Sequence, residues 1–262
     1  MKVHDFKRKK AQQQKISFIT CYDYPSACII SESSIDCVLV GDSVAMTMHG
    51  HDTTLTASMD MMALHTAAVA RGLKHQFLVS DLPFLCHRES TSNTIQYVRQ
   101  LIQAGAHAIK LEGGDQHTCE TIHHIVSSGV PVMGHIGLTP QFYHQLGGYA
   151  VQGKKEAQAA LLVEQAKALE SAGCFALVIE CVPQSVAKTI TNSLSIPTIG
   201  IGAGLNTDGQ VLVWHDVLGL QPEFKPKFVK HYLNGKDLIL EAINAYANDV
   251  SETSFPTTDH IY

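Results

Sequence analysis

The chain has 262 residues, of which 45% are hydrophobic and only 16% are charged, and its formal net charge is −5. Soluble proteins typically carry about 25% charged residues, so an unusually large share of this chain must avoid solvent, in a core or at subunit contacts. Lys7–Lys10 is the one cluster of Lys and Arg. A binding surface for nucleic acid needs a longer basic stripe, so the composition argues against that partner.

The sequence also argues against a membrane protein. Residues 121–153 and 189–207 contain no Asp, Glu, Lys or Arg, but Gly, Pro and polar residues interrupt both stretches, so neither is expected to span a bilayer. Seven cysteines are an odd number, and no two are spaced as C-x-x-C. This pattern favours reduced, mostly buried thiols and a cytoplasmic protein.

Short apolar runs bounded by turn-forming residues recur along the chain. They are apolar almost throughout, which is typical of strands buried on both faces of a parallel sheet. The predicted strands are Ile16–Thr20, Cys37–Val40, Phe77–Val79, Ala108–Leu111, Pro131–Met133, Ala176–Ile179, Thr198–Ile201 and Val211–Val213.

Helical spacing of apolar residues marks the segments between most of these runs. Three of them, Ser58–Arg71, Thr91–Ala104 and Lys155–Ala172, are each followed directly by glycine, a common helix stop. Alternating strands and helices over ~250 residues predict an α/β protein with a single (β/α)8 TIM barrel. A doubly wound open sheet is the alternative. One domain is expected over 1–262, with a polar N-terminal segment 1–14 and a C-terminal tail 250–262.

Polar residues come directly after, or within the end of, five predicted strands. In a barrel these ends meet at one mouth, where active sites lie. Lys110 and Glu112 are two residues apart, so they face the same way on a strand, either into the pocket or as a structural ion pair. The candidate site residues are Asp42, Ser43, Asp81, Lys110, Glu112, His135 and Glu180.

The four acids among these residues could each cap the helix that follows. This explanation suits Asp42 and Asp81 poorly, because the next helical patterns start several residues later. Four carboxylates at one mouth would repel one another unless a cation lies between them. Oxygen ligands without a Cys/His cluster favour a hard ion, so the pattern predicts Mg²⁺.

Eight motifs carry a family resemblance: VGDS at Val40–Ser43, GHDTTL at Gly50–Leu55, SDLPF at Ser80–Phe84, KLEGG at Lys110–Gly114, GHIGLTPQ at Gly134–Gln141, GGYAVQG at Gly147–Gly153, IECVP at Ile179–Pro183 and IGIGAG at Ile199–Gly204. In this order they resemble the ketopantoate hydroxymethyltransferase family. The likeness runs from Thr20–Asp23 to Pro226–Phe228, which is nearly the whole chain.

The resemblance implies a barrel of the phosphoenolpyruvate/isocitrate lyase superfamily and a cytoplasmic enzyme of pantothenate biosynthesis, assembled as a homodecamer. Such an enzyme transfers a hydroxymethyl group from 5,10-methylenetetrahydrofolate to 3-methyl-2-oxobutanoate through a Mg²⁺-stabilised enolate, giving 2-dehydropantoate. The residue roles it implies are Mg²⁺ ligation by Asp42, Asp81 and Glu112, substrate binding by Asp42, Ser43, Asp81, Lys110 and His135, and proton abstraction by Glu180.

Two other functions fit the same residues. One is a Mg²⁺-dependent carbon–carbon lyase or a phosphoenolpyruvate mutase-like enzyme, which would need no folate. The other is an inert oligomeric barrel, although such a barrel would not need this set of polar residues. The chain also departs from the family pattern in two loops, at Leu85–His87 and at Thr54–Ser58, and neither change touches a predicted ligand.

Overall fold

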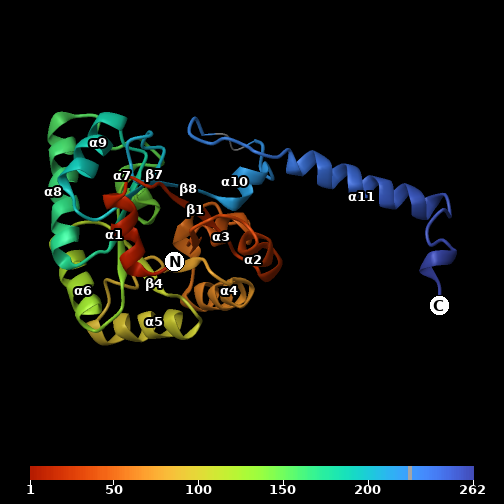
Figure 1. Cartoon of the computed structure of the whole chain (residues 1–262), viewed down its shortest axis with the longest axis horizontal. Coiled ribbons are helices and arrows are strands. Elements are labelled where there is room, and N and C mark those ends of the chain that lie inside the picture. The colour runs from red at the N-terminus through yellow and green to blue at the C-terminus, as the bar shows by residue number, and fades with distance from the viewer. Residues whose placement is uncertain (224–225) are drawn as a thin grey trace. The chain divides into compact units, whose positions relative to one another are not determined.

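The structure, a computed structural model, describes residues 1–223 and 226–262. Eight parallel strands pair in sequence order and close into a barrel (Figure 1). They are β1 Ile16–Thr20, β2 Cys37–Val40, β3 Phe77–Asp81, β4 Ala108–Glu112, β5 Val132–Gly137, β6 Ala176–Glu180, β7 Thr198–Ile201 and β8 Gly209–Leu212. The closing pair places Ile16 of β1 opposite Gly209 of β8. The predicted barrel is therefore confirmed, and the open-sheet alternative is wrong, because β8 pairs with β1 as well as with β7.

Four strands run further than their apolar residues indicated, and the longest extension is that of β5, which ends at Gly137 and not at the predicted Met133. Asp81, Glu112 and Glu180 are the last residues of β3, β4 and β6 and still take part in strand pairing. The eighth strand begins at Gly209, two residues earlier than the predicted Val211. Parallel pairing extends these strands because neighbouring backbones satisfy each other's hydrogen bonds whatever the side chain is.

The predicted helices agree with the structure to within one residue at each end. Ser58, for example, caps the helix that follows it, because its Oγ accepts a hydrogen bond of 3.2 Å from the backbone N–H of Met61. The α-helices are α1 Val3–Ala11, α2 Tyr24–Ser31, α3 Val44–Thr47, α4 Met59–Gly72, α5 Thr91–Gln103, α6 Gln116–Ser127, α7 Tyr143–Leu146, α8 Glu156–Ala172, α9 Gln184–Ser193, α10 Trp214–Leu218 and α11 Gly235–Ser251.

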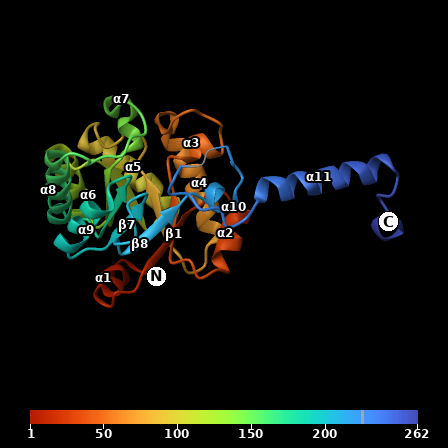
Figure 2. The ribbon, with the colours of Figure 1, turned by 90° about the horizontal axis from the view of Figure 1, so that it is seen from above.

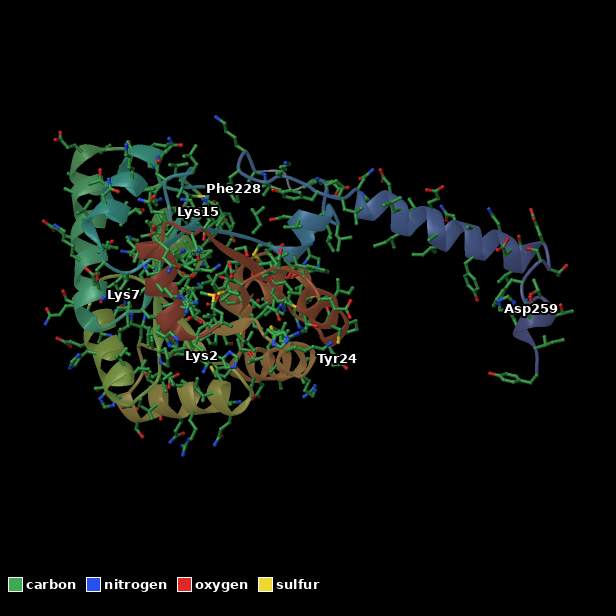
Figure 3. The ribbon with its side chains drawn as sticks, viewed as in Figure 1. Lys2, Lys7, Lys15, Tyr24, Phe228 and Asp259 are labelled. Atoms are coloured by element: carbon green, nitrogen blue, oxygen red, sulfur yellow. The ribbon has the colours of Figure 1, made fainter. Side chains whose placement is uncertain are left out.

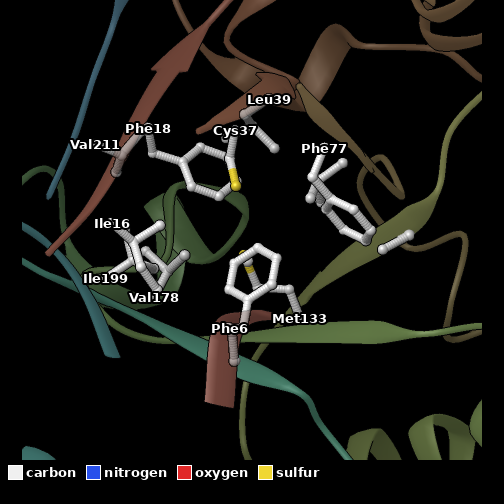
Figure 4. Packing of buried hydrophobic residues seen from close by; sticks show 13 residues of the cluster. Phe6, Ile16, Phe18, Cys37, Leu39, Phe77, Met133, Val178, Ile199 and Val211 are labelled. Atoms are coloured by element: carbon white, nitrogen blue, oxygen red, sulfur yellow. The ribbon is translucent and has the colours of Figure 1, made fainter. Parts of the chain in front are cut away.

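A cluster of apolar side chains from all eight strands fills the barrel (Figure 4). Phe6 of α1 joins it from outside the sheet, fully buried, with its ring centroid 5.3 Å from Phe77 and 4.9 Å from Phe175. Edge-to-face packing of this kind stabilises aromatic clusters. Helix α1 lies at the opposite end of the strands from α3 and α7 (Figure 2). The apolar core therefore occupies the α1 end of the barrel.

The basic residues of the N-terminal segment are largely paired with acids. Lys10 lies 2.9 Å from Asp208, Lys9 forms an ion pair with Asp36, and both partners are partly buried. Figure 3 shows other basic residues of this part of the chain, Lys2, Lys7 and Lys15. These contacts hold α1 to the barrel through charge as well as through Phe6.

The described residues form two compact units, Met1–Leu212, which contains the barrel, and Val213–Tyr262, which contains α10 and α11. The expected organisation, one domain over 1–262 with a segment 1–14 and a tail 250–262, stays a prediction. Within residues 1–223 and 226–262, no helix combines the length and apolar composition that crossing a bilayer requires.

Candidate active site

The structure brings the predicted polar residues together at the ends of β2 to β6. Strand periodicity explains why they point inward, since side chains two apart face the same way. Asp81 lies two residues after Val79, and Glu180 lies two residues after Val178, and both valines belong to the barrel core. The same inward face is therefore apolar deep in the barrel and polar at its mouth.

Lys110 is the centre of this polar cluster. Its Nζ lies 3.1 Å from Asp81 Oδ1, 3.7 Å from Glu112 Oε1 and 3.3 Å from His135 Nδ1. The residue is only 4% exposed, and burial alone would lower the pKa of its ammonium group. The carboxylates of Asp81, Glu112 and Asp42 outweigh burial and raise that pKa, so Lys110 is a permanent buried cation.

His135 on β5 connects two carboxylates that lie on the flanking strands, β4 and β6. Its Nδ1 lies 3.2 Å from Glu112 Oε1, and its Nε2 lies 3.2 Å from Glu180 Oε2. Burial and the charge of Lys110 lower the pKa of His135, but the two glutamates outweigh them and raise it to about 9. The imidazole is therefore protonated at neutral pH, with Nδ1 donating a hydrogen bond to Glu112 and Nε2 forming an ion pair with Glu180.

Asp42 and Asp81 form the opposite side of the cluster. The backbone N–H of Asp42 donates a hydrogen bond of 3.0 Å to Asp81 Oδ2. Burial raises the pKa of both carboxyl groups, and for Asp42 the charges of Asp81 and Glu112 raise it further. Ionisation of both carboxyl groups is therefore disfavoured unless further positive charge is supplied here.

Ser43, the remaining predicted residue, is only partly buried and faces Tyr22. The two hydroxyl groups are 2.7 Å apart and share a hydrogen bond. Burial raises the pKa of the Tyr22 hydroxyl to about 12, so it stays protonated and available as a donor. Sequence reasoning did not single out Tyr22, because it lies in the loop between β1 and α2 and not at the end of an apolar run.

With this geometry in place, comparison with known proteins decides the family. Residues 1–258 match the family model described as ketopantoate hydroxymethyltransferase. The chain belongs to this family. A relative from Legionella pneumophila (strain Paris), named 3-methyl-2-oxobutanoate hydroxymethyltransferase, is 64% identical over 262 residues and covers 100% of both chains. One of the same name from Coxiella burnetii (strain CbuK_Q154) is 52% identical over 100% of this chain and 99% of its own length.

Membership of the ketopantoate hydroxymethyltransferase family confirms the predicted enzyme class, a hydroxymethyl transferase. Solved structures confirm the predicted barrel fold. A phosphoenolpyruvate phosphomutase from Streptomyces platensis subsp. rosaceus superposes with a TM-score of 0.65 over 100% of this chain and 92% of its own, at 13% identity. A 2,3-dimethylmalate lyase, described as a member of the phosphoenolpyruvate mutase/isocitrate lyase superfamily, gives 0.61 over 98% and 90%, also at 13%. At such identity the likeness concerns the fold alone.

Gln141 is a site residue to which sequence reasoning gave no role. Its backbone N–H donates to Glu112 Oε2 at 3.0 Å, and its Nε2 donates at 2.9 Å to both Asp42 Oδ2 and the backbone oxygen of Leu82. It connects two carboxylates that lie on different strands. The available signal was its place in the GHIGLTPQ motif, but Gln141 comes four residues after β5, outside the strand ends on which the prediction concentrated.

The donor chemistry of this cluster fits the Mg²⁺ ion that the family resemblance implies. Asp42, Asp81, Glu112 and Glu180 supply four carboxylates, whereas Lys110 and protonated His135 supply two positive charges. When all four carboxyl groups are ionised, two negative charges are left for a divalent ion, and carboxylate oxygens are the ligands that Mg²⁺ prefers. The side-chain Oε1 of Gln141 is also buried there without a hydrogen-bond partner.

The carboxylates expected to bind Mg²⁺ are not arranged around one common position in this structure. In the part of the chain that the structure describes, no three His, Cys, Asp or Glu side chains are grouped so that they could hold a metal ion. Lys110 explains this arrangement, because its ammonium group lies against Asp81 and Glu112. Mg²⁺ and Lys110 would therefore compete for the same carboxylate oxygens.

The loop after β3, where the chain departs from the family pattern, is built around a neutral histidine. His87 is 2% exposed, and its Nε2 accepts a hydrogen bond of 3.0 Å from Arg88 Nε. Burial and the charge of Arg88 lower the pKa of His87 to about 4. Arg88 in turn pairs with Asp115 after β4. The residues that differ from the family pattern therefore fix the shape of this loop and add no charge at the barrel mouth.

Proposed function

We propose that this enzyme transfers a hydroxymethyl group from 5,10-methylenetetrahydrofolate to 3-methyl-2-oxobutanoate, a step of pantothenate biosynthesis. The C3–H bond of the oxo acid breaks, and C3 bonds to the methylene carbon of the folate. Both C–N bonds to that carbon break, water supplies the new hydroxyl group, and the two folate nitrogens take up one proton each. The products are 2-dehydropantoate and tetrahydrofolate, so atoms and charges balance.

The observation that carries this proposal is the buried, charged cluster at the barrel mouth in a chain 64% identical to a relative named for this reaction. We assign proton abstraction at C3 to Glu180. His135 Nε2 contacts only one oxygen of this carboxylate, Oε2 at 3.2 Å, which orients the group. A positioned carboxylate within hydrogen-bonding reach of its substrate is the usual general base for such a proton.

The remaining residues bind and polarise the oxo acid. Lys110 places a permanent positive charge where the substrate carboxylate and the developing enolate oxygen need one, and Ser43 can donate a hydrogen bond there. Asp42, Asp81 and Glu112 would hold Mg²⁺. When bound, that ion polarises the carbonyl of the oxo acid and stabilises negative charge on its oxygen.

Two finer properties belong to the same proposal. A cytoplasmic location is supported by the seven cysteines, which are all free thiols. A homo-oligomer, with ten subunits as the family resemblance implies, is supported by the large apolar side chains that α11 leaves uncovered within its own unit, since burial against another subunit would remove them from water. These side chains are Leu238, Ile239, Leu240, Ile243, Tyr246 and Val250.

One incubation tests the proposed reaction. The protein is mixed with 3-methyl-2-oxobutanoate, 5,10-methylenetetrahydrofolate and Mg²⁺, and the products are identified by mass spectrometry. We expect 2-dehydropantoate and tetrahydrofolate, and without folate we expect only exchange of deuterium at C3. Cleavage of other oxo acids, with no 2-dehydropantoate, would instead support a lyase.

A further inference from the structure

The loop Gly147–Gly153 crosses the barrel mouth and is held at two points. At one, the backbone N–H of Gln152 donates a hydrogen bond of 2.9 Å to the backbone oxygen of Cys181, the residue directly after Glu180. At the other, the Tyr149 hydroxyl donates to the sulfur of Met46 at 3.7 Å. Met46 belongs to α3, which begins two residues after Asp42. The loop therefore lies between the Glu180 side and the Asp42 side of the site.

Tyr149 presents an aromatic face at this position. Its ring centroid lies 5.1 Å from that of Tyr143, with an angle of 58° between the rings, yet the residue is 48% exposed. Burial raises the pKa of its hydroxyl, and so do the charges of Tyr143, Asp42, Glu180 and Glu112. Tyr149 therefore lies near the charged residues of the site, and about half of its surface is open to solvent.

The loops at this end of the barrel expose several apolar side chains, unlike the charged cluster beneath. Val151 on the same loop, Met48 after α3 and Phe84 after β3 are also exposed, and all of them follow strands at this end of the barrel. Carboxylates, Lys110 and His135 suit a small anionic substrate. A large, flat heteroaromatic molecule suits an apolar rim with an aromatic side chain.

We propose that Tyr149 is the platform on which the fused heteroaromatic ring of the one-carbon donor stacks. This inference rests on the proposed function, because the donor's methylene carbon must come within bonding distance of C3 of the oxo acid. The oxo acid lies among the charged residues, so the donor ring has to approach from the open mouth. Tyr149 lies there, between the general base and the substrate-binding acids.

One of the two contacts that hold the loop on the barrel does not depend on Tyr149. Gln152 makes its contact with Cys181 through backbone atoms, and Gly147 and Gly148 adopt φ angles of 70° and 110°, which suit glycine whatever follows. Tyr149→Ala therefore removes the ring and the contact with Met46 but leaves the contact between Gln152 and Cys181. Tyr149→Phe removes only the contact with Met46, so a comparison of the two variants isolates the ring. Proton abstraction at C3, which involves only the oxo acid and the residues beneath, should stay intact.

The experiment compares two reactions in Tyr149→Ala, Tyr149→Phe and the wild type. We expect Tyr149→Ala to raise the KM for 5,10-methylenetetrahydrofolate about tenfold, because one buried aromatic face is lost, and to leave the rate of deuterium exchange at C3 within about twofold. Tyr149→Phe keeps the ring and should keep the KM. Tyr97→Ala, on the outer helix α5, is the matched control and should change neither reaction.

The outcomes separate this inference from the function on which it rests. An unchanged KM for the folate in Tyr149→Ala overturns the platform. A parallel loss of C3 exchange in that variant also overturns it, because Tyr149 would then act on the oxo acid or on the loop as a whole. A wild-type protein that makes no 2-dehydropantoate overturns the proposed function and, with it, the role proposed for Tyr149.

Discussion

Lys110→Met tests how the buried charges of the site balance one another. The substitution keeps most of the side-chain volume and removes the ammonium group, which lies 3.1 Å from Asp81 and 3.7 Å from Glu112. All three side chains are at most 5% exposed, so water cannot replace the lost partner. Truncating one member of a buried ion pair costs about 3–5 kcal/mol. For a chain of this size, that corresponds to a fall of roughly 6–20 °C in Tm.

The loss of stability in Lys110→Met should depend on pH and on Mg²⁺. Burial already raises the pKa of Asp81, and the variant removes the cation that opposes this effect. Ionised carboxylates with raised pKa values destabilise the fold at neutral pH, and protonation relieves this as pH falls through the raised values. The difference in stability between Lys110→Met and the wild type should therefore be smaller at acidic pH. It should also shrink with Mg²⁺, because the ion no longer competes with an ammonium group for the carboxylates.

Thermal unfolding checks these expectations at one protein concentration, with and without Mg²⁺, at several pH values. The control is Lys236→Met, because Lys236 pairs with Glu223 on the surface, where the side chains are 45% and 76% exposed. Solvent screens this pair, so we expect no measurable change in Tm. The reasoning fails if the two variants have the same Tm, or if Mg²⁺ stabilises Lys110→Met no more than it stabilises the wild type.

Three further predictions concern single residues of the site. Glu180→Gln should abolish deuterium exchange at C3, while calorimetry should still detect binding of the oxo acid with Mg²⁺. Retained exchange would show that Glu180 is not the base. Glu223→Gln, at an exposed position, is the control. Asp81→Asn should raise the Mg²⁺ concentration needed for half-maximal activity at least about tenfold. The control, Asp60→Asn at an exposed position, should leave this concentration unchanged. An unchanged concentration in Asp81→Asn would rule out Asp81 as a ligand. Protonated His135, with a pKa raised from 6.5 to about 9, should stabilise the metal-free protein fully below pH 6.5, and this contribution should disappear as pH rises through about 9. Parallel Tm profiles for His135→Gln and the wild type over this range would contradict that assignment.

The sequence by itself determined which chain segments become strands and where the chemistry lies. Buried parallel strands must be apolar along most of their length, so a single polar residue at the end of a run, such as Asp81 or Glu180, is conspicuous. Period-two alternation then places Lys110 and Glu112 on one face. These are local properties of a strand, and for this reason they could be read from one sequence.

Only the tertiary structure decided how these residues pair and what surrounds them. Closure of the barrel depends on Gly209 of β8 meeting Ile16 of β1, and burial of Phe6 depends on Phe77 and Phe175 being at the same end of the barrel. Gln141 likewise binds Asp42, 99 positions away in the chain. Such contacts follow from closing a sheet on itself, which brings together loops whose own sequences carry no strand or helix periodicity. The pairing of Lys110 with Asp81 has the same origin, since the packing of β3 against β4 sets the distance between these two charges.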